Sequence, residues 1–200
     1  MSPEQQAEIL SYIGVEQWVL RTQVHANIAI DAKQDVEQAI SQCQACPLAC
    51  ETPFVGETVG SKPKLLIISE SINELEQAFS PQAIVLFNNM INALRLSDYF
   101  LITAIKCPTK NEQDLKHANT CSQFLAYEIE QKQPNVILTL GNVASQSLLK
   151  TTAKAFQLRN KIQDFNNIPV ISSFHPEFLL KFPAKKKLFW QDLLRLSSLL

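Results

Sequence analysis

The sequence contains only four glycines in 200 residues, and this scarcity limits the chemistry that it can support. Phosphate-binding loops need closely spaced glycines because the backbone must approach the phosphate groups, so nucleotide hydrolysis by such a loop is excluded. No apolar run reaches the roughly 18 to 20 residues that span a bilayer, and the start MSPEQQAEIL lacks the basic and apolar regions of a secretory signal. These absences predict a cytoplasmic protein without membrane contact.

An excess of charge of either sign is also lacking. The chain has 18 Lys and Arg against 19 Asp and Glu, which gives a formal net charge of -1. A chain with this balance has no overall field that attracts nucleic acid. A local basic patch is present at Lys181, Lys185, Lys186 and Lys187, and a solvated helix face is its simpler interpretation. We therefore expect any contact with DNA to be weak and local.

Short apolar runs alternate with helical stretches from Lys64 to the C-terminus. The runs without polar alternation indicate strands that are buried on both faces, and the stretches between them indicate helices that cover a parallel sheet. This pattern predicts a three-layer, doubly wound α/β domain with a mainly parallel sheet over residues 31–200, preceded by a further helix at Asp31–Gln42. The segments concerned are KLLIIS, VLFNNMINALRL, YFLITAI, DLKHANTCSQFLAYEIEQ, NVILTL, NVASQSLLK, PVISSF and AKKKLFWQDLLRLSSLL.

Residues 1–30 differ in character from the domain that follows. Ser2 and Pro3 are typical of a helix start and Gly14 of a helix stop, so SPEQQAEILSYIG predicts a short amphipathic helix. The next segment, VEQWVLRTQV, is too polar and too short to build a core but displays Trp18, a residue type enriched where binding energy concentrates. We expect this segment either to fold back on its own domain or to dock on a partner protein.

Four of the five cysteines are spaced as metal ligands. Cys43 and Cys46 form a close pair, Cys107 ends an expected strand, and Cys121 lies in the following helix. Disulfides are rare in the cytoplasm, so a Cys-x-x-Cys pair there favours metal binding or redox chemistry. Four thiolates satisfy either zinc or an iron-sulfur cluster, and four unrelated buried thiols remain an alternative. Cys50 has no assignment.

Segments in the same order resemble the iron-sulfur uracil-DNA glycosylases. They are CQACPLACETPFVGETVGSKPKLLIISES, YFLITAIKCPTKNEQDLKHANTC, PNVILTLGNVASQSLL and PVISSFHPEFLL, and together they cover about three quarters of the chain. The resemblance implies a uracil-DNA glycosylase-like fold. It also implies that Cys43, Cys46, Cys107 and Cys121 hold a 4Fe-4S cluster, with zinc as the alternative metal.

Several residue types that glycosylase chemistry needs are replaced. The resemblance places Glu70 in the acidic position of SESIN, where the family has Gly-Glu-Ala-Pro-Gly, and His175 in the family's His-Pro motif. The family's uracil-reading asparagine is Ala104 here, whose methyl group cannot hydrogen-bond a base. The segment that supplies the stacking aromatic ring is replaced around SPQAIVLFNN, where Phe87 is nearby but out of pattern. We therefore expect a non-catalytic domain in which Glu70 and His175 are degenerate candidates.

The N-terminal stretch ILSYIGVEQWVLR resembles that of the psi subunit of the bacterial DNA polymerase III clamp loader. This resemblance implies a protein that bridges the clamp-loader ATPase subunits, of the tau or gamma type, to the chi subunit and indirectly to single-strand-binding protein. A divergent iron-sulfur uracil-DNA glycosylase acting in base excision repair is the alternative. The expected partner-binding residues are Ile13, Val15, Trp18, Val19, Leu20 and Arg21.

Overall fold

The computed structural model describes residues 36–61, 63–73, 77–109 and 115–200. Residues 1–30, to which the sequence assigns a partner-binding segment, lie outside these ranges. The helices are α2 (Val36–Ser41), α3 (Pro81–Ala93), α4 (Leu115–Lys132), α5 (Asn142–Leu149), α6 (Ala155–Leu158), α7 (Pro176–Lys181) and α8 (Lys186–Ser197), with a 3-10 turn at Pro183–Lys185. The strands are β1 (Glu57–Val59), β2 (Leu65–Ser69), β3 (Tyr99–Thr103), β4 (Val136–Leu140), β5 (Gln163–Phe165) and β6 (Ile168–Ser173).

The strands form one sheet in the order β1-β3-β2-β4-β6-β5. The four inner strands run parallel, and the short edge strands β1 and β5 pair antiparallel with β3 and β6. Every residue of β2 and β4 is buried, as expected for strands covered on both faces. The predicted α/β fold with a mainly parallel sheet is confirmed.

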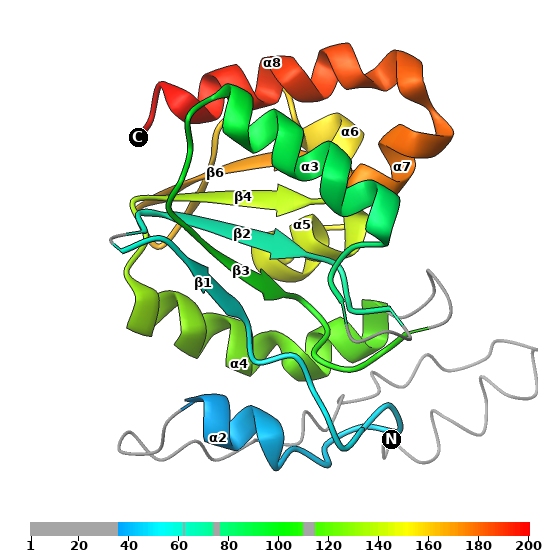
Figure 1. The fold of residues 1–200 in the computed structure, drawn as a ribbon. Helices are drawn as coiled ribbons and strands as arrows, with labels where there is room; N and C mark the ends of the chain where they lie inside the picture. The colour runs from blue at the N-terminus through cyan, green and yellow to red at the C-terminus, as the bar shows by residue number, and fades with distance from the viewer. Residues whose placement is uncertain (1–35, 62, 74–76, 110–114) are drawn as a thin grey trace, which may run out of the picture.

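Helices cover both faces of the sheet, which gives three layers (Figure 1). Leu65 and Ile67 of β2 pack with α3 and α8 in one core cluster, whereas Leu66 and Ile68 pack with α4 and α5 in the other. This division follows from the alternation of side chains along a strand. Helix α2 packs on the outer side of α4 through a smaller cluster, which includes Phe124.

The structure differs from the expected elements mainly where segments are short. Helix α3 begins at Pro81, four residues before the expected start, because Ser80 caps it by accepting a hydrogen bond from the Ala83 N–H at 3.3 Å. The two edge strands have three residues each and α6 has four, so none of them carries a readable hydrophobic period. Within the described ranges, no helix has the length and apolar character needed to cross a membrane.

Candidate active site and thiol cluster

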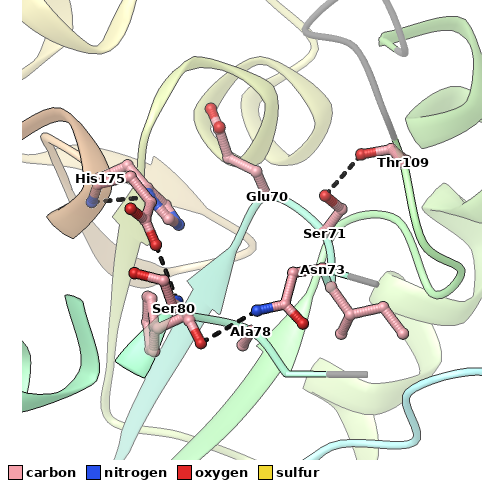
Figure 2. A pocket seen from close by; sticks show the side chains of 10 residues that line it. Glu70, Ser71, Asn73, Ala78, Ser80, Thr109 and His175 are labelled. Carbon is pink, nitrogen blue, oxygen red and sulfur yellow. Dashed lines mark hydrogen bonds between the residues drawn. The ribbon is translucent and has the colours of Figure 1, made fainter. Parts of the chain in front are cut away.

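A cavity of about 210 Å³ opens at the carboxyl ends of the parallel strands (Figure 2). Glu70 follows the last residue of β2, and His175 lies two residues after the end of β6. Ligands in open α/β sheets bind at this edge, because the connecting loops converge there. The cavity is lined by Glu70, Ser71, Ile72, Asn73, Ala78, Phe79, Ser80, Thr109, His175 and Glu177. The structure thus brings together Glu70 and His175, which are distant in the sequence.

Hydrogen bonds fix the protonation and orientation of His175. Its Nδ1 accepts a hydrogen bond from the backbone N–H of Glu177 at 3.3 Å, so the neutral ring carries its proton on Nε2. Nε2 lies 3.0 Å from Ser69 Oγ, and this hydroxyl donates in turn to the Ala78 carbonyl at 3.4 Å. Burial lowers the pKa of His175 to about 4. The imidazole is therefore a neutral N–H donor at physiological pH.

Glu70 is held by the first turn of α5. Its Oε1 accepts a hydrogen bond from the Val143 N–H at 3.0 Å, and a helix N-terminus favours a negative charge. Gly141 precedes this helix with a φ of +92°, and a Cβ atom at residue 141 would collide with the Glu70 carboxylate. The loop therefore needs glycine both for its backbone conformation and for the space that the carboxylate occupies.

A second carboxylate, Glu177, also lines the cavity. Its Oε1 accepts a hydrogen bond from the Ser80 N–H at 2.8 Å, so it ties the start of α7 to the start of α3. The Ser71 and Thr109 hydroxyls are 2.8 Å apart on the other side of Glu70 (Figure 2). Each hydroxyl can donate or accept, so this pair can bond to either a donor or an acceptor on a bound molecule.

The aromatic ring of the cavity is Phe79, which the sequence analysis missed. The Phe79 ring lies 5.4 Å from the His175 ring, centroid to centroid. Phe87, the residue considered from sequence, is fully buried and stacks behind Phe79 at 5.0 Å. The start of α3 at Ser-Pro was a usable signal, because it places Phe79 directly at the entrance of that helix.

Ala104 does not line the cavity. It is fully buried in the core cluster on the side of α4 and α5, and its N–H donates to the Ser69 carbonyl at 2.9 Å. Residue 104 therefore offers no contact to a group in the cavity, whose polar lining side chains include Ser71 and Thr109.

All five cysteines lie in one region between the Cys43–Cys50 segment, the end of β3 and α4. Burial raises the pKa of Cys121 to about 11, and the thiols of Cys46 and Cys43 are close enough to add to this rise. Burial also raises the pKa of Cys107 to about 12, with a contribution from contact with the Cys50 thiol. The structure thus places Cys50, which the sequence left unassigned, against Cys107.

The donor set suits a metal group that binds several thiolates. Among the residues described, no three Cys, His, Asp or Glu side chains close around a single metal position. A zinc ion needs all its sulfur ligands about 2.3 Å from one point, whereas an iron-sulfur cluster spreads its thiolates over several metal atoms. The nearby Lys106 ammonium lowers the pKa of Cys121 against the effect of burial and forms a buried ion pair with Glu128 at 2.6 Å. The sulfur-only donors come from three segments of the chain and fit a group that spreads its thiolates, whereas the Lys106 charge is already balanced by Glu128.

Comparison with known proteins agrees with this geometry. The profile of the uracil DNA glycosylase superfamily matches residues 56–194. The chain belongs to this superfamily. It is 22% identical over 187 residues to a type-4 uracil-DNA glycosylase of Archaeoglobus fulgidus, covering 85% of this chain and 94% of that protein. It is 26% identical over 184 residues to that of Saccharolobus solfataricus, covering 82% and 85% of the two chains. The type-4 enzyme of Thermotoga maritima is 26% identical over 157 residues, 73% of this chain and 82% of that protein.

These matches overturn the function expected from the N-terminal stretch. The prediction of a non-catalytic clamp-loader psi subunit, with ATPase subunits and chi as its partners, is wrong: relatives aligned over most of the chain are named as uracil-DNA glycosylases. The psi resemblance rested on about a dozen residues around Trp18, and a match that short carries little weight beside relatives aligned over most of the chain. Those residues lie outside the described ranges.

Proposed function

We propose that the protein is a DNA glycosylase that removes uracil from DNA by hydrolysing its N-glycosidic bond. The observation that carries the proposal is the cavity in which Glu70 and a neutral His175 meet at the carboxyl edge of the sheet. Family membership and the names of the type-4 relatives support the same activity. A glycosylase must take the base out of the stack, and a cavity of about 210 Å³ suits one small ring.

The two polar groups have complementary roles in bond cleavage. The oxygen of a water molecule forms a bond with the sugar carbon, the bond from that carbon to the base nitrogen breaks, and its electron pair leaves with the base. The water gives up one proton to become the sugar hydroxyl, and the departing base takes up one proton from solvent. The Nε2–H of His175 donates to the base oxygen on which negative charge develops. The carboxylate of Glu70 stabilises positive charge on the sugar and orients the water.

Phe79 and the hydroxyl pair would hold the base. The Phe79 ring offers a face for stacking, and Phe87 supports it from behind. Ser71 and Thr109 can adjust their hydroxyl protons to the edge of the base. A side chain that both donates and accepts discriminates less between bases than a fixed amide. We therefore expect uracil to be removed with weaker selectivity than a site with the family's asparagine would give.

We also propose that Cys43, Cys46, Cys107 and Cys121 hold a 4Fe-4S cluster. Such a cluster would cross-link the segment after α2 to the end of β3 and to α4, and so contribute to the free energy of folding. Cys50 would lie beside the cluster ligand Cys107, to which its backbone N–H donates a hydrogen bond.

The test is base release from oligonucleotides that carry a single uracil, read as strand cleavage after alkali treatment. The wild-type protein should release uracil, and matched strands with thymine should stay intact. Glu70→Gln and His175→Ala should each lower the rate by about 10²–10³-fold. Glu130→Gln, an exposed carboxylate on α4, is the matched control and should leave the rate unchanged. Uracil retained by single and double strands alike would show that the proposal is wrong.

A further inference from the structure

A second cavity, of about 530 Å³, adjoins the first and shares Glu70 and His175 with it. Its volume is more than twice that of the first cavity and lies within the range of about 300–1,000 Å³ typical of small-molecule sites. In the proposed reaction the departing base occupies the first cavity, which leaves room here for another part of the strand. Its other lining residues are Gly141, Asn142, Val143, Gln146, Lys154, Ala155, Phe156, Phe174 and Phe178.

Aromatic rings dominate one side of this second cavity. Phe156, on α6, is 57% exposed. Burying this apolar ring against a ligand would lower the free energy, because apolar surface is removed from water. Phe174 and Phe178 stack at a centroid distance of 5.2 Å, and Phe182 continues the stack at 4.7 Å while remaining 52% exposed. Flat rings that line a cavity and reach its rim provide stacking surfaces for another flat ring.

Positive charges flank these rings. Lys154 lines the cavity itself, and the Lys185 Nζ lies 5.9 Å from the centroid of the Phe156 ring. Lys181 and Lys187 are exposed on the adjoining segment, so the basic patch seen in the sequence continues the same surface. Aromatic rings beside lysines are the combination by which proteins bind single-stranded nucleic acid, with stacking for bases and cations for phosphates.

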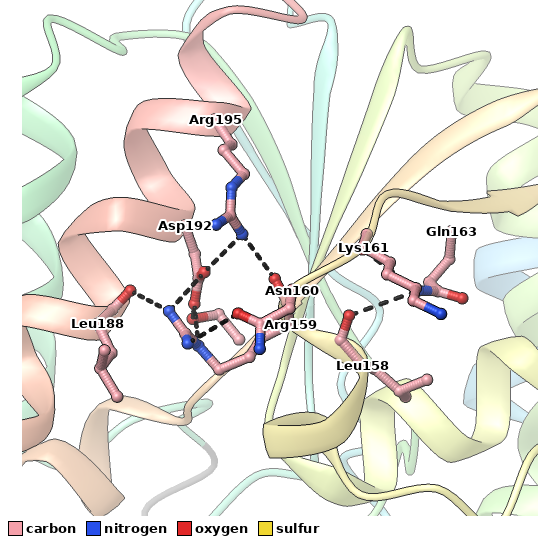
Figure 3. Close-up of polar contacts among 9 residues, drawn as sticks. Leu158, Arg159, Asn160, Lys161, Gln163, Leu188, Asp192 and Arg195 are labelled. Carbon is pink, nitrogen blue, oxygen red and sulfur yellow. Dashed lines mark hydrogen bonds and ion pairs between the residues drawn. The ribbon is translucent and has the colours of Figure 1, made fainter.

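Buried polar contacts hold this wall in place (Figure 3). Arg159, which ends α6, donates to both carboxylate oxygens of Asp192 on α8 at 3.1 and 3.0 Å, and the two side chains are 5% and 0% exposed. The Ser173 hydroxyl on β6 donates to the same carboxylate at 2.6 Å. The Arg159 guanidinium also lies 5.7 Å from the Phe174 ring centroid. The wall is therefore pre-formed, and a ligand would not have to order it on binding.

We propose that the second cavity binds the nucleobase next to the one held in the first cavity, on the same single strand of DNA. That base stacks on Phe156, and the phosphate beside it lies near Lys154. This inference rests on the proposed function and adds a second contact with its substrate strand. A base in a duplex must leave its stack and its partner to enter the cavity, whereas a base in a single strand pays much less, so the test uses single strands.

The experiment measures fluorescence anisotropy with a short single strand that carries one 2′-fluorodeoxyuridine, a nucleotide that resists hydrolysis. Two further strands replace the nucleotide on its 5′ or 3′ side with an abasic residue. The wild-type protein should lose affinity about tenfold for one of these strands, as expected for one lost stacking contact. Phe156→Ala should bind the complete strand about tenfold more weakly and lose nothing further with the abasic strand. Phe156→Trp should restore the difference between the strands.

Val85→Ala, an equally exposed apolar position on α3, is the control and should behave as the wild type. Lys154→Gln should reduce the salt dependence of binding, because one phosphate contact is lost. If Phe156→Ala binds all strands as the wild type does, or if the flanking base makes no difference, the inference is wrong. Failure of the proposed function has a different signature: the wild type releases no uracil, whatever the anisotropy shows.

Discussion

Ser69→Ala should make the protein less stable and a faster glycosylase. In the structure, the Nε2–H of His175 donates to the Ser69 hydroxyl at 3.0 Å, where the resemblance places a glycine of the family motif. The departing base has to compete with this hydroxyl for the same proton. A net hydrogen bond of about 0.5–1.5 kcal/mol corresponds to a rise of roughly 2- to 10-fold in kcat/KM when the competitor is removed.

The same substitution leaves a buried N–H without its partner when no base is bound. This costs about 1–2 kcal/mol, which for a chain of this size lowers the Tm by about 2–8 °C. Thermal melting and single-turnover uracil release measure the two effects separately. A variant that is as slow as His175→Ala would refute the reasoning, since it would make the Ser69 hydroxyl a required group and not a competitor. An unchanged Tm would equally show that the hydrogen bond contributes nothing.

Three further predictions concern the metal, the pH dependence and the polar core. Cys107→Ser should abolish bound iron and lower the Tm, whereas Cys50→Ser should keep the iron, as measured by iron and sulfide content; equal iron in both variants would contradict the ligand assignment. The pKa of His175 is about 4 in the folded state and 6.5 ordinarily, so the unfolded chain takes up this proton first. The free energy of unfolding should therefore be unaffected by this group above pH 6.5, and it should fall by at most about 3 kcal/mol as the pH drops to about 4. Denaturant titrations of His175→Ala should lack this loss. Asp192→Ala should cost about 3–5 kcal/mol in the free energy of unfolding because it leaves Arg159 buried without a counter-charge, and removing the 43% exposed Arg195 should cost less than about 1 kcal/mol.

The sequence predicted the parts of the fold that depend on long patterns. β2 and β4 were readable because every residue in them is apolar or buried, and the cysteine spacing pointed to a common site. Phe79 was missed because its role depends on the exact start of α3, which a propensity reading placed four residues too late. The hydrogen bond between Ser69 and His175 joins positions 106 residues apart, and no local pattern predicts such a contact.

The prediction of a clamp-loader subunit depended on Trp18 and its neighbours, and it is wrong. A short segment with one tryptophan predicts binding to something, but it does not specify the partner. The replaced residues in SESIN and at Ala104 predict a loss of catalysis, yet the cavity keeps a carboxylate, an imidazole and an aromatic ring in one place. Side-chain chemistry at a site can be supplied from other positions, and only the three-dimensional arrangement reveals this.

The close approach of Gly141 to Glu70 allows geometry to be separated from chemistry. Adding one methyl group at residue 141 would collide with the Glu70 carboxylate and would also strain a backbone held at a φ of +92°, while every ionisable side chain of the protein stays the same. A strand of DNA would still meet His175, Phe79 and the rings around Phe156. We expect such a protein to keep more of its affinity for DNA than of its rate of base release.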